Sequence, residues 1–403
     1  MLSHHEQNKD NSNTAFLNVP TISKAHFSFN NVVSNKNLYK LPNNFVNISV
    51  RSECEDLNSF SAFDQNSVPQ FVDFKFNKLY NHIIKSIYLF VKFSSSALTN
   101  SSLLPLSHMI SKIEISRSNS EILQTILSHD IYHFHKLNWN VNNSDVSANI
   151  INSSSLIANG TIKNYIELPT IFNGTYLSKF KGDDIFLRVY FRQRDSKLVT
   201  STSVNQDNTK ISLSECKIFF DLNEVDSSVA KSIDSNSFID YVQCIPETYN
   251  FYSGNMQANT NYDLQVSQIY KNTCAGFTTW ILGNTGNAED VYNYIKPNAL
   301  QIKSINNQEE SVAYDDLLVK VMNKHKIPDN MSLGESNEMS WFFDCNNVNE
   351  TMKGNYIDGF RNYKSTELKY VINFPSASNS IFITFLTYKL VRISDDSVKV
   401  LLS

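Results

Sequence analysis

The chain has 403 residues, of which 41% are hydrophobic, and its formal net charge at pH 7 is −4. This length is sufficient for two or three domains, each with its own core. The slightly acidic charge and the lack of a long basic run exclude a dedicated nucleic-acid-binding protein, which needs clustered lysines and arginines to displace the counterions of phosphates.

The first half of the chain reads mainly as strands. Residues 1–24 are polar and predict an arm, with no apolar run that would make a secretory signal. Residues 83–93 are apolar on nearly both faces, so one face is expected in a core and the other against a second layer or subunit. A short helix is predicted over residues 126–136, and the alternation in residues 184–191 predicts a half-buried strand.

The second half repeats this character after a polar junction. A change of phase in residues 211–222 predicts a β-bulge, and the polar residues 226–237 predict a linker. A second short helix is expected over residues 314–326, and residues 398–402 predict a terminal strand. Long loops are predicted at residues 138–164, 195–210, 283–298 and 328–364, which are rich in Asn, Ser, Asp and Gly.

Short segments of the first half recur in the same order in the second half. The pairs are residues 71–74 with 238–241, 113–121 with 302–310, and 184–191 with 380–387. The period is far longer than the roughly 20–50 residues of a solenoid repeat. The ordered repeat therefore predicts two similar all-β domains in tandem.

The 10 glycines and 5 cysteines carry two further expectations. Because glycine is scarce, asparagine is expected at turn positions with positive φ, which it tolerates better than other side chains. The cysteines are widely spaced and form no CxxC motif, so they predict neither a zinc site nor a disulfide framework, and they indicate a reducing compartment. They are Cys54, Cys216, Cys244, Cys274 and Cys345.

The best candidate for a metal site is the histidine-rich stretch at residues 128–135. His129 and His133 are four residues apart and would share a helix face, a spacing that suits zinc. No glutamate follows His129, so the metalloprotease motif is not met. The favoured interpretation is a helix that runs from surface to core and carries partly exposed histidines.

Other candidate chemistry also has a structural explanation. The carboxylate pairs Asp183-Asp184, Asp315-Asp316 and Asp395-Asp396 stand at predicted element starts, where turn and N-cap roles explain them. The glycines of residues 282–287 lack the following Lys-Ser/Thr of a phosphate-binding loop, so a turn is favoured. The aromatic residues at 277–280 and 341–343 could stack on sugars, but packing in a core or interface is favoured.

One predicted strand has a basic outer face. Arg188, Arg192 and Arg194 alternate along it, and Lys197 lies just beyond. Such a face could meet an acidic neighbouring subunit, a lipid headgroup or a phosphate. The favoured partner is a neighbouring subunit.

The order of elements resembles one known family. Each half reads as a strand, a long apolar strand, an Ile-x-Ile strand with a polar turn, a short helix, and a proline-containing entry to paired strands at residues 166–170 or 372–376. In this order the chain resembles the double jelly-roll major capsid proteins of tailless icosahedral DNA viruses, a lineage that includes bacteriophages, virophages, polinton-like viruses and large DNA viruses. The resemblance spans about residues 25–403 and is strongest at residues 108–126 and 168–191.

The resemblance implies an all-β fold of two tandem eight-stranded jelly rolls with short helices in loops. The first jelly roll would span residues 25–225, after the arm at 1–24, and the second residues 238–403, after the linker at 226–237. It implies a structural major capsid protein, not an enzyme, that forms homotrimers and pseudo-hexameric capsomers. No catalytic, cofactor-binding or metal-binding residue is expected.

The resemblance also implies partners and a location. The partners are further copies of the chain, penton proteins and minor capsid proteins, with an internal membrane left open and no sequence-specific binding of nucleic acid. The location is the virion shell, assembled in the host cytoplasm or another reducing compartment. The residues leave two alternatives open: a carbohydrate- or receptor-binding β-sandwich protein, and an enzyme with two carboxylates in a cleft of such a sandwich.

Overall fold

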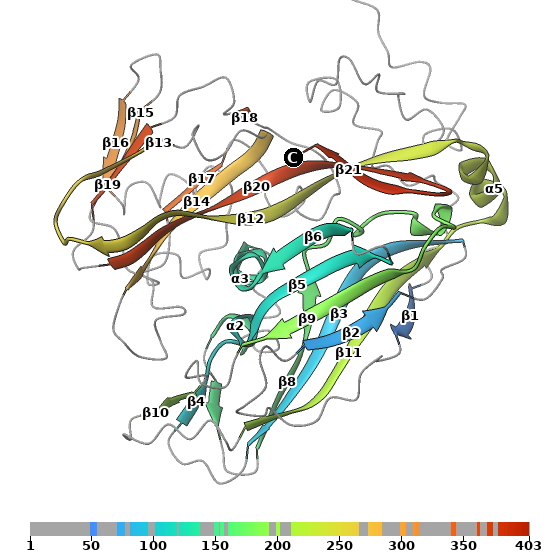
Figure 1. Cartoon of the computed structure of the whole chain (residues 1–403), viewed down its shortest axis with the longest axis horizontal. Coiled ribbons are helices and arrows are strands. Elements are labelled where there is room, and N and C mark those ends of the chain that lie inside the picture. The colour runs from blue at the N-terminus through green and yellow to red at the C-terminus, as the bar shows by residue number, and fades with distance from the viewer. Residues whose placement is uncertain are drawn as a thin grey trace, which may run out of the picture.

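The fold is described by a computed structural model of the chain (Figure 1). The predicted arm at residues 1–24 and the predicted helix at residues 314–326 lie outside the described residues. The described residues are 49–54, 71–76, 81–95, 101–118, 121–137, 149–152, 154–156, 160–192, 199–201, 211–265, 273–283, 299–303, 309–313, 340–343, 361–362, 369–373 and 378–402.

The first half of the chain forms two four-stranded antiparallel sheets. Its main strands are β1 (Ser49–Cys54), β2 (Phe71–Lys75), β3 (His82–Ser95), β5 (Ile110–Arg117), β6 (Ile122–Leu127), β8 (Thr161–Leu168), β9 (Ile185–Phe191) and β11 (Ile211–Glu224). One sheet has the order β1-β11-β3-β8, and the other has the order β2-β9-β5-β6.

The second half forms two more antiparallel sheets. Its strands are β12 (Phe238–Met256), β13 (Tyr262–Gln265), β14 (Thr273–Gly283), β15 (Ala299–Lys303), β16 (Glu309–Ala313), β17 (Ser340–Phe343), β18 (Arg361–Asn362), β19 (Lys369–Asn373), β20 (Ser378–Ser394) and β21 (Val398–Leu402). One sheet has the order β12-β20-β14-β17, with β18 on β14 and β21 on β20, and the other has the order β13-β19-β15-β16.

The two halves have the same strand order. We number the main strands of each half from first to eighth along the chain, leaving aside the short strands β18 and β21. In both halves one sheet then joins the first, eighth, third and sixth strands, and the other joins the second, seventh, fourth and fifth. Two facing sheets with these connections are a jelly roll, so the chain is a double jelly roll.

Short elements fill the connections of the first jelly roll. A three-stranded sheet of order β10-β4-β7 lies at its lower end in Figure 1. These elements are β4 (Ser101–Leu103), β7 (Ser154–Leu156), β10 (Val199–Ser201), α2 (Leu106–Met109), α3 (Ser128–Leu137) and the 3-10 helix η3 (Leu177–Lys179). The helix α5 (Ser227–Ser235) connects the two halves, and the Asp226 carboxylate caps it by accepting a hydrogen bond from the Ser228 backbone amide at 2.8 Å.

Local patterns account for several elements. In β9 buried and half-buried residues alternate along the whole strand, as the sequence predicts for a strand with one face in a core. The predicted bulge in β11 is confirmed by a shift in its pairing with β3 between Leu213 and Glu215. The predicted helix at residues 126–136 is α3, and the predicted terminal strand is β21. The predicted loop at residues 138–164 is partly wrong, because it includes β7 and the start of β8.

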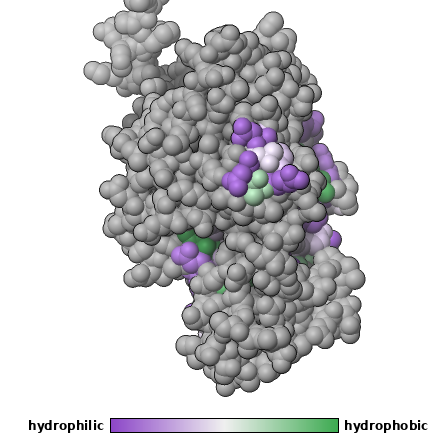
Figure 2. Space-filling model, turned by 90° about the vertical axis from the view of Figure 1, so that its left-hand side faces the viewer, coloured by the Kyte–Doolittle hydropathy of each residue, from purple (hydrophilic) through white to green (hydrophobic). Residues whose placement is uncertain are grey.

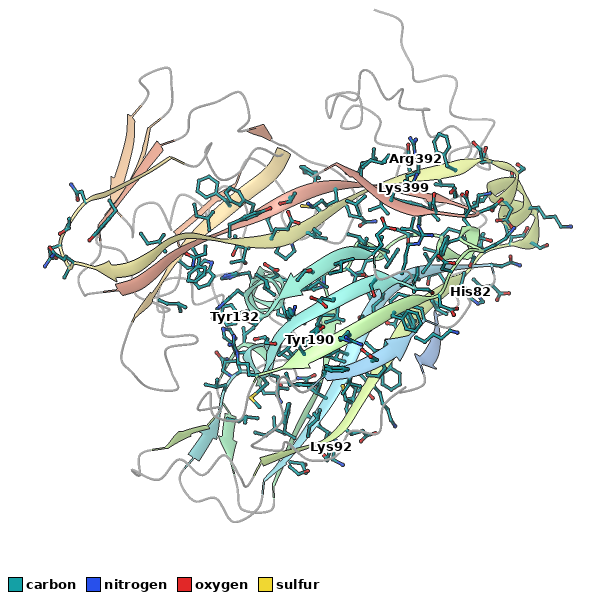
Figure 3. All side chains as sticks on the ribbon, viewed as in Figure 1. His82, Lys92, Tyr132, Tyr190, Arg392 and Lys399 are labelled. Carbon is teal, nitrogen blue, oxygen red and sulfur yellow. The ribbon has the colours of Figure 1, made fainter. Side chains whose placement is uncertain are left out.

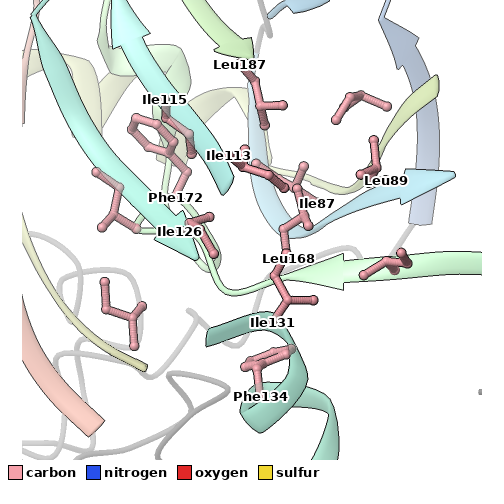
Figure 4. Packing of buried hydrophobic residues seen from close by; sticks show 14 of the residues in the cluster. Ile87, Leu89, Ile113, Ile115, Ile126, Ile131, Phe134, Leu168, Phe172 and Leu187 are labelled. Carbon is pink, nitrogen blue, oxygen red and sulfur yellow. The ribbon is translucent and has the colours of Figure 1, made fainter. Parts of the chain in front are cut away.

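The core of the first jelly roll lies between its two sheets (Figure 4). Ile113 and Ile115 of β5 and Leu187 of β9 are fully buried in one cluster with Ile87 and Leu89 of β3. Figure 4 also labels Ile126, Ile131, Phe134, Leu168 and Phe172 of this cluster. The cluster is continuous with buried residues of β12, β14 and β20, so the two jelly rolls share packed apolar surface.

The strand order corrects two of the three predicted repeat pairs. The pair at residues 113–121 and 302–310 does correspond, because its described starts, residues 113–117 and 302–303, both lie in the fourth strand of their half. Residues 71–74 belong to a second strand, however, whereas residues 238–241 begin a first strand. Residues 184–191 lie in the seventh strand and residues 380–387 in the eighth. Similar local alternation produces similar short sequences on strands with different places in the fold.

Asparagine occupies described turn positions with positive φ, as the sequence predicts, and Gly174 occupies a further one at φ 77. Apart from glycine, the described residues with positive φ are Asn81 and Asn259, each at φ 55. Asn259 lies in the exposed, polar turn between β12 and β13. This turn is at the end of the molecule seen in Figure 2, which shows a hydrophilic patch there. Within the described part of the chain, no helix is long and apolar enough to cross a membrane.

Candidate functional site

The two jelly rolls meet along a seam, which we define as the contact of α3, β6 and η3 with β12, β14 and β20 (Figures 1 and 3). The seam covers the outer face of the second jelly roll's β12-β20-β14 sheet. In β20 all residues from Ile383 to Val391 are buried, so both faces of this strand are covered. A sheet enclosed on both faces reads as a nearly continuous apolar run, which is how residues 381–391 read in the sequence.

Aromatic rings form the centre of the seam. Trp280 of β14 stacks on Phe382 of β20 with ring centroids 4.3 Å apart and planes within 7°. The imidazole of His129 on α3 lies 4.2 Å from the Trp280 ring and 5.9 Å from the Phe382 ring. His133, one turn further along α3, lies 5.5 Å from Trp280. One helix of the first jelly roll therefore packs its histidines on an aromatic pair of the second.

A third histidine joins this cluster from α2. His108 meets His129 edge-on at 5.1 Å and Tyr132 at 5.0 Å. The Arg192 guanidinium lies beside it, donating to the His108 backbone carbonyl at 2.5 Å and to the Ser128 hydroxyl at 3.0 Å. Burial, followed by the nearby positive charges, holds the pKa values of His108 and His129 well below their ordinary range. These imidazoles are therefore neutral near pH 7.

A chain of hydrogen bonds crosses the seam next to the rings. The Trp280 indole donates to the Thr384 hydroxyl at 2.9 Å, which lies 2.8 Å from the Thr248 hydroxyl. Thr248 donates to the Asp130 carboxylate at 2.6 Å, and the Leu127 backbone amide donates to its other oxygen at 2.8 Å. Burial raises the pKa of Asp130 to about 7, against the effect of these hydrogen bonds. The carboxyl thus titrates near neutral pH inside the seam.

The candidate metal pair therefore lies in the seam. His129 and His133 face the same aromatic cluster, and His133 is fully buried, so the expectation of partly exposed histidines is wrong for His133. Within the described residues, no group of three or more His, Cys, Asp or Glu side chains is arranged to hold a metal ion. The observed contacts are ring packing between the two jelly rolls.

A second group of contacts fixes the other end of the seam. Lys179 of η3 is fully buried, and its ammonium donates to the Asp234 carbonyl of α5 at 2.7 Å. The same ammonium lies 3.1 Å from the Asp395 carboxylate in the turn between β20 and β21. Close by, the Tyr176 backbone amide donates to the Tyr241 hydroxyl at 3.1 Å. One lysine thus joins the first jelly roll, the connecting helix and the second jelly roll.

The paired carboxylates at turns take part in the same region. Arg117, at the end of β5, lies 3.2 Å from the Asp183 carboxylate and donates to the Asp396 backbone carbonyl at 3.4 Å. Asp184 pairs with Lys75 at 2.7 Å. The described pairs lie between strands, as predicted, and they also tie neighbouring elements together, whereas Asp315-Asp316 lies outside the described residues.

Two arginine–carboxylate units occur on paired strands. Arg188 of β9 donates two hydrogen bonds to the Asp73 carboxylate of β2, a bidentate contact. Its guanidinium also stacks 4.2 Å from the centre of the Phe71 ring. On β20, Arg392 makes the same bidentate contact with Asp240 of β12 and stacks 3.9 Å from the Phe238 ring. The similar segments at residues 71–74 and 238–241 encode these two units. The hydrogen bonds to Asp73 and Asp240 raise the pKa values of the two arginines.

The prediction of a free basic face on β9 needs correction. Arg188 is neutralised within the chain by Asp73, and Arg192 turns toward His108 and Ser128. Their cross-strand and seam partners could not be read from the alternation of β9 alone. Arg194 and Lys197 lie outside the described residues.

An aromatic patch lies on the outer face of the first jelly roll's β11-β3-β8 sheet. Phe90 of β3 lies 4.8 Å from the Tyr165 ring of β8 and 6.5 Å from the Phe219 ring of β11. Tyr165 lies 5.4 Å from Phe219 and is 45% exposed. The sequence analysis missed these residues, although the two-faced apolarity of residues 83–93 indicated that β3 has a second contact surface.

The chain resembles known proteins in structure and not in sequence. No protein-family model and no curated protein sequence matches the chain. Solved structures do match. The chain is similar to PBCV-1 VP54, as fitted into a reconstruction of the virophage Sputnik, with a TM-score of 0.63 and 10% identity over 91% of this chain and 99% of that one.

Two further structures come from other viruses. For the Faustovirus major capsid protein the TM-score is 0.54, with 9% identity over 87% of this chain and 91% of that one. For the mavirus major capsid protein the TM-score is 0.51, with 10% identity over 88% of this chain and 90% of that one. All of these structures are double jelly-roll major capsid proteins. At such low identity the likeness shows the fold, and that fold is the one predicted from the sequence.

Proposed function

We propose that the chain is the major capsid protein of an icosahedral virus, and that three copies form a pseudo-hexameric capsomer. The observation that carries this proposal is the identical strand order of two jelly rolls held side by side in one chain. Three such chains in a ring present six similar units, which suits a position with six neighbours in a closed shell. The solved structures with this fold, named above, are major capsid proteins.

The seam supports a structural role. A capsomer needs a fixed angle between the two jelly rolls of each chain, because that angle sets how the ring closes. The rings around Trp280 fix one end of the seam, and the contacts of Lys179 fix the other. The proposal divides the chain into jelly rolls at residues 25–225 and 238–403, with 226–237 as the connection. It includes no catalytic residue and no cofactor.

The partners and the location belong to the same proposal. The partners are further copies of the chain, penton proteins and minor capsid proteins, and the location is the virion shell. Assembly in a reducing compartment is part of the same proposal, since the five cysteines of the chain form no CxxC motif and no recognisable disulfide framework.

Size and shape of the purified protein test the proposal. Light scattering after size exclusion should give three times the 46.0 kDa of the chain, and electron microscopy should show six-lobed rings. The contact between subunits should bury more than roughly 2,000 Å² in total, the upper end for a standard interface. A stable monomer at every concentration tested would contradict the proposal. Specific binding of a glycan by such a monomer would favour the carbohydrate-binding alternative.

A further inference from the structure

The two ends of the seam are held by different chemistry. At the end next to α5, the ammonium of Lys179 reaches the Asp234 carbonyl and the Asp395 carboxylate. At the end next to α3, the ring contacts are between uncharged groups, because imidazoles of α3 lie on the stacked rings of Trp280 and Phe382. Figure 1 shows α3 and α5 at opposite ends of the seam. The α3 end therefore depends on imidazoles that stay neutral.

The groups that act on these imidazoles are basic. The rings of His108 and His129 meet edge-on at 5.1 Å, and His133 is fully buried on the same helix as His129. Arg192 lies beside His108, and its positive charge lowers the pKa values of His108 and His129 in addition to the effect of burial. The rings that face His129 from the second jelly roll carry no charge. A proton taken up here would thus place a new positive charge among rings and near an arginine.

The nearby carboxylates do not balance such a charge. Burial raises the pKa of Asp130 to about 7, so this carboxyl is already protonated at the pH at which an imidazole gains its proton. Glu247, which acts on Asp130 from β12, is paired with the Lys389 ammonium at 2.8 Å. The face of the Trp280 ring can attract a charged His129, but loss of hydration on burial is the largest cause of the lowered pKa of His129. Protonation therefore opposes the contact of α3 with the second jelly roll.

We propose that the α3 end of the seam is an acid-sensitive switch: when His108 and His129 become charged, α3 leaves the rings of the second jelly roll while the α5 end stays closed. A lysine ammonium keeps its protons throughout the acid range, and its bond to a backbone carbonyl does not titrate, so Lys179 holds the α5 end as a hinge. The consequence for a shell rests on the proposed function, because a changed angle between the jelly rolls of each chain would open the ring of three chains.

Amide hydrogen exchange of the full chain tests the switch. His129→Phe keeps a ring against Trp280 but cannot take up a proton. The ratio of wild-type to variant exchange rates in α3 should rise about tenfold between pH 7.5 and pH 5.5, because one imidazole contributes about tenfold at one pH unit below its ordinary pKa of about 6.5. His135→Gln is the control, since His135 of the same helix contacts the Glu167 carbonyl of the first jelly roll, and this variant should open as the wild type does.

The wild type alone gives a second readout, which decides the matter if His129→Phe does not fold. Exchange in α3, relative to exchange in the core strands β5 and β9, should rise about tenfold or more between pH 7.5 and pH 5.5 and return when the pH is restored. An unchanged ratio would overturn the switch. Equal acceleration in α3, β5 and β9 would also overturn it, because that pattern is a loss of global stability.

Light scattering of the same samples separates this inference from the proposed function. Trimers at pH 7.5 without any acid-dependent change in the exchange of α3 would overturn the switch and leave the capsid role standing. A chain that opens at α3 in acid but never associates would keep the switch and remove the capsid role.

Discussion

The arginine–carboxylate unit on β2 and β9 and the one on β12 and β20 contain the same residues in the same register but lie at different depths. In each unit the arginine stands directly opposite the carboxylate on the paired strand. The side chains of Arg188 and Asp73 are 41% and 18% exposed, whereas those of Arg392 and Asp240 are 14% and 1% exposed. The same local sequence thus forms a surface ion pair in one half and a buried one in the other.

The difference in depth has an energetic consequence. Water screens the charges of a surface pair and can solvate either partner when the other is removed. A buried partner has no such alternative, so its removal leaves an uncompensated charge. Equal geometry therefore does not mean equal contribution to stability, and the two units provide a test within one molecule.

The largest effect is expected at the apolar positions of the two strands that carry these arginines. Leu187→Asp on β9 and Ile383→Asp on β20 each place a carboxylate where the native side chain is fully buried. An unpaired buried charge costs several kcal/mol, compared with a total stability of roughly 5–15 kcal/mol. Both variants should lose soluble, folded protein, as measured by yield and thermal melting. Thr125→Asp, at an exposed position of β6, is the control, and normal melting of both core variants would show that the faces are assigned wrongly.

Removing the buried carboxylate should have the next largest effect. Asp240→Ala leaves the Arg392 guanidinium without its partner beside Phe238, and we expect a loss of about 3–5 kcal/mol in the free energy of unfolding. Chemical denaturation measures this loss. Asp240→Asn, which keeps the shape and one acceptor, should lose less. A loss no greater than that of Asp73→Ala would contradict the importance of depth.

The seam should respond to pH, in contrast to the arginine pairs. The pKa values of His108 and His129 are lowered by burial, so their contribution to stability is present above the unfolded value of about 6.5 and lost as the pH falls below it, by up to about 1.4 kcal/mol per pH unit for each histidine. The pKa of Asp130 is raised to about 7, so its contribution is lost as the pH rises through 7. Below about pH 6.5 the loss from the two histidines outweighs the gain from the carboxyl, and no further loss is expected above pH 7, so maximum stability is expected near pH 6.5.

Melting temperature as a function of pH, in matched variants, checks this expectation. Asp130→Asn should remove the decline in stability between about pH 6.5 and 7 and leave a steeper loss below pH 6.5. His129→Phe, which keeps a ring against Trp280, should reduce the loss below pH 6.5 instead. Identical pH profiles for both variants and the wild type would contradict the assignment of these groups.

The smallest effect is expected at the surface pair. Asp73→Ala should cost about 1 kcal/mol or less, because Arg188 can turn to water and still stack on Phe71. A double-mutant cycle with Arg188→Ala isolates the interaction between the two side chains, and added salt should weaken it. A coupling as large as that of Asp240 with Arg392 would show that the exposure of the pair does not decide its contribution.

The sequence alone was enough for the fold class and for those elements whose signal is local. The alternation of β9, the bulge in β11, the helix α3 and the terminal strand β21 follow from spacing within a few residues, because the period of buried positions reports the backbone conformation. The ordered repeat predicted two similar all-β domains, and the resemblance of the element order predicted jelly rolls, although two of the three repeat pairs lie on strands that do not correspond. Alternating apolar residues identify a strand, but they do not specify its neighbours.

Only the tertiary structure decided which residues form the seam and the patch. His108, His129 and Trp280 come from α2, α3 and β14, and no periodicity links such distant segments. The same holds for Arg192, whose alternation indicated an outer face but whose guanidinium lies in the seam beside His108. Depth is likewise a tertiary property, because the segments at residues 71–74 and 238–241 read alike, yet the side chain of Asp240 is 1% exposed and that of Asp73 is 18% exposed.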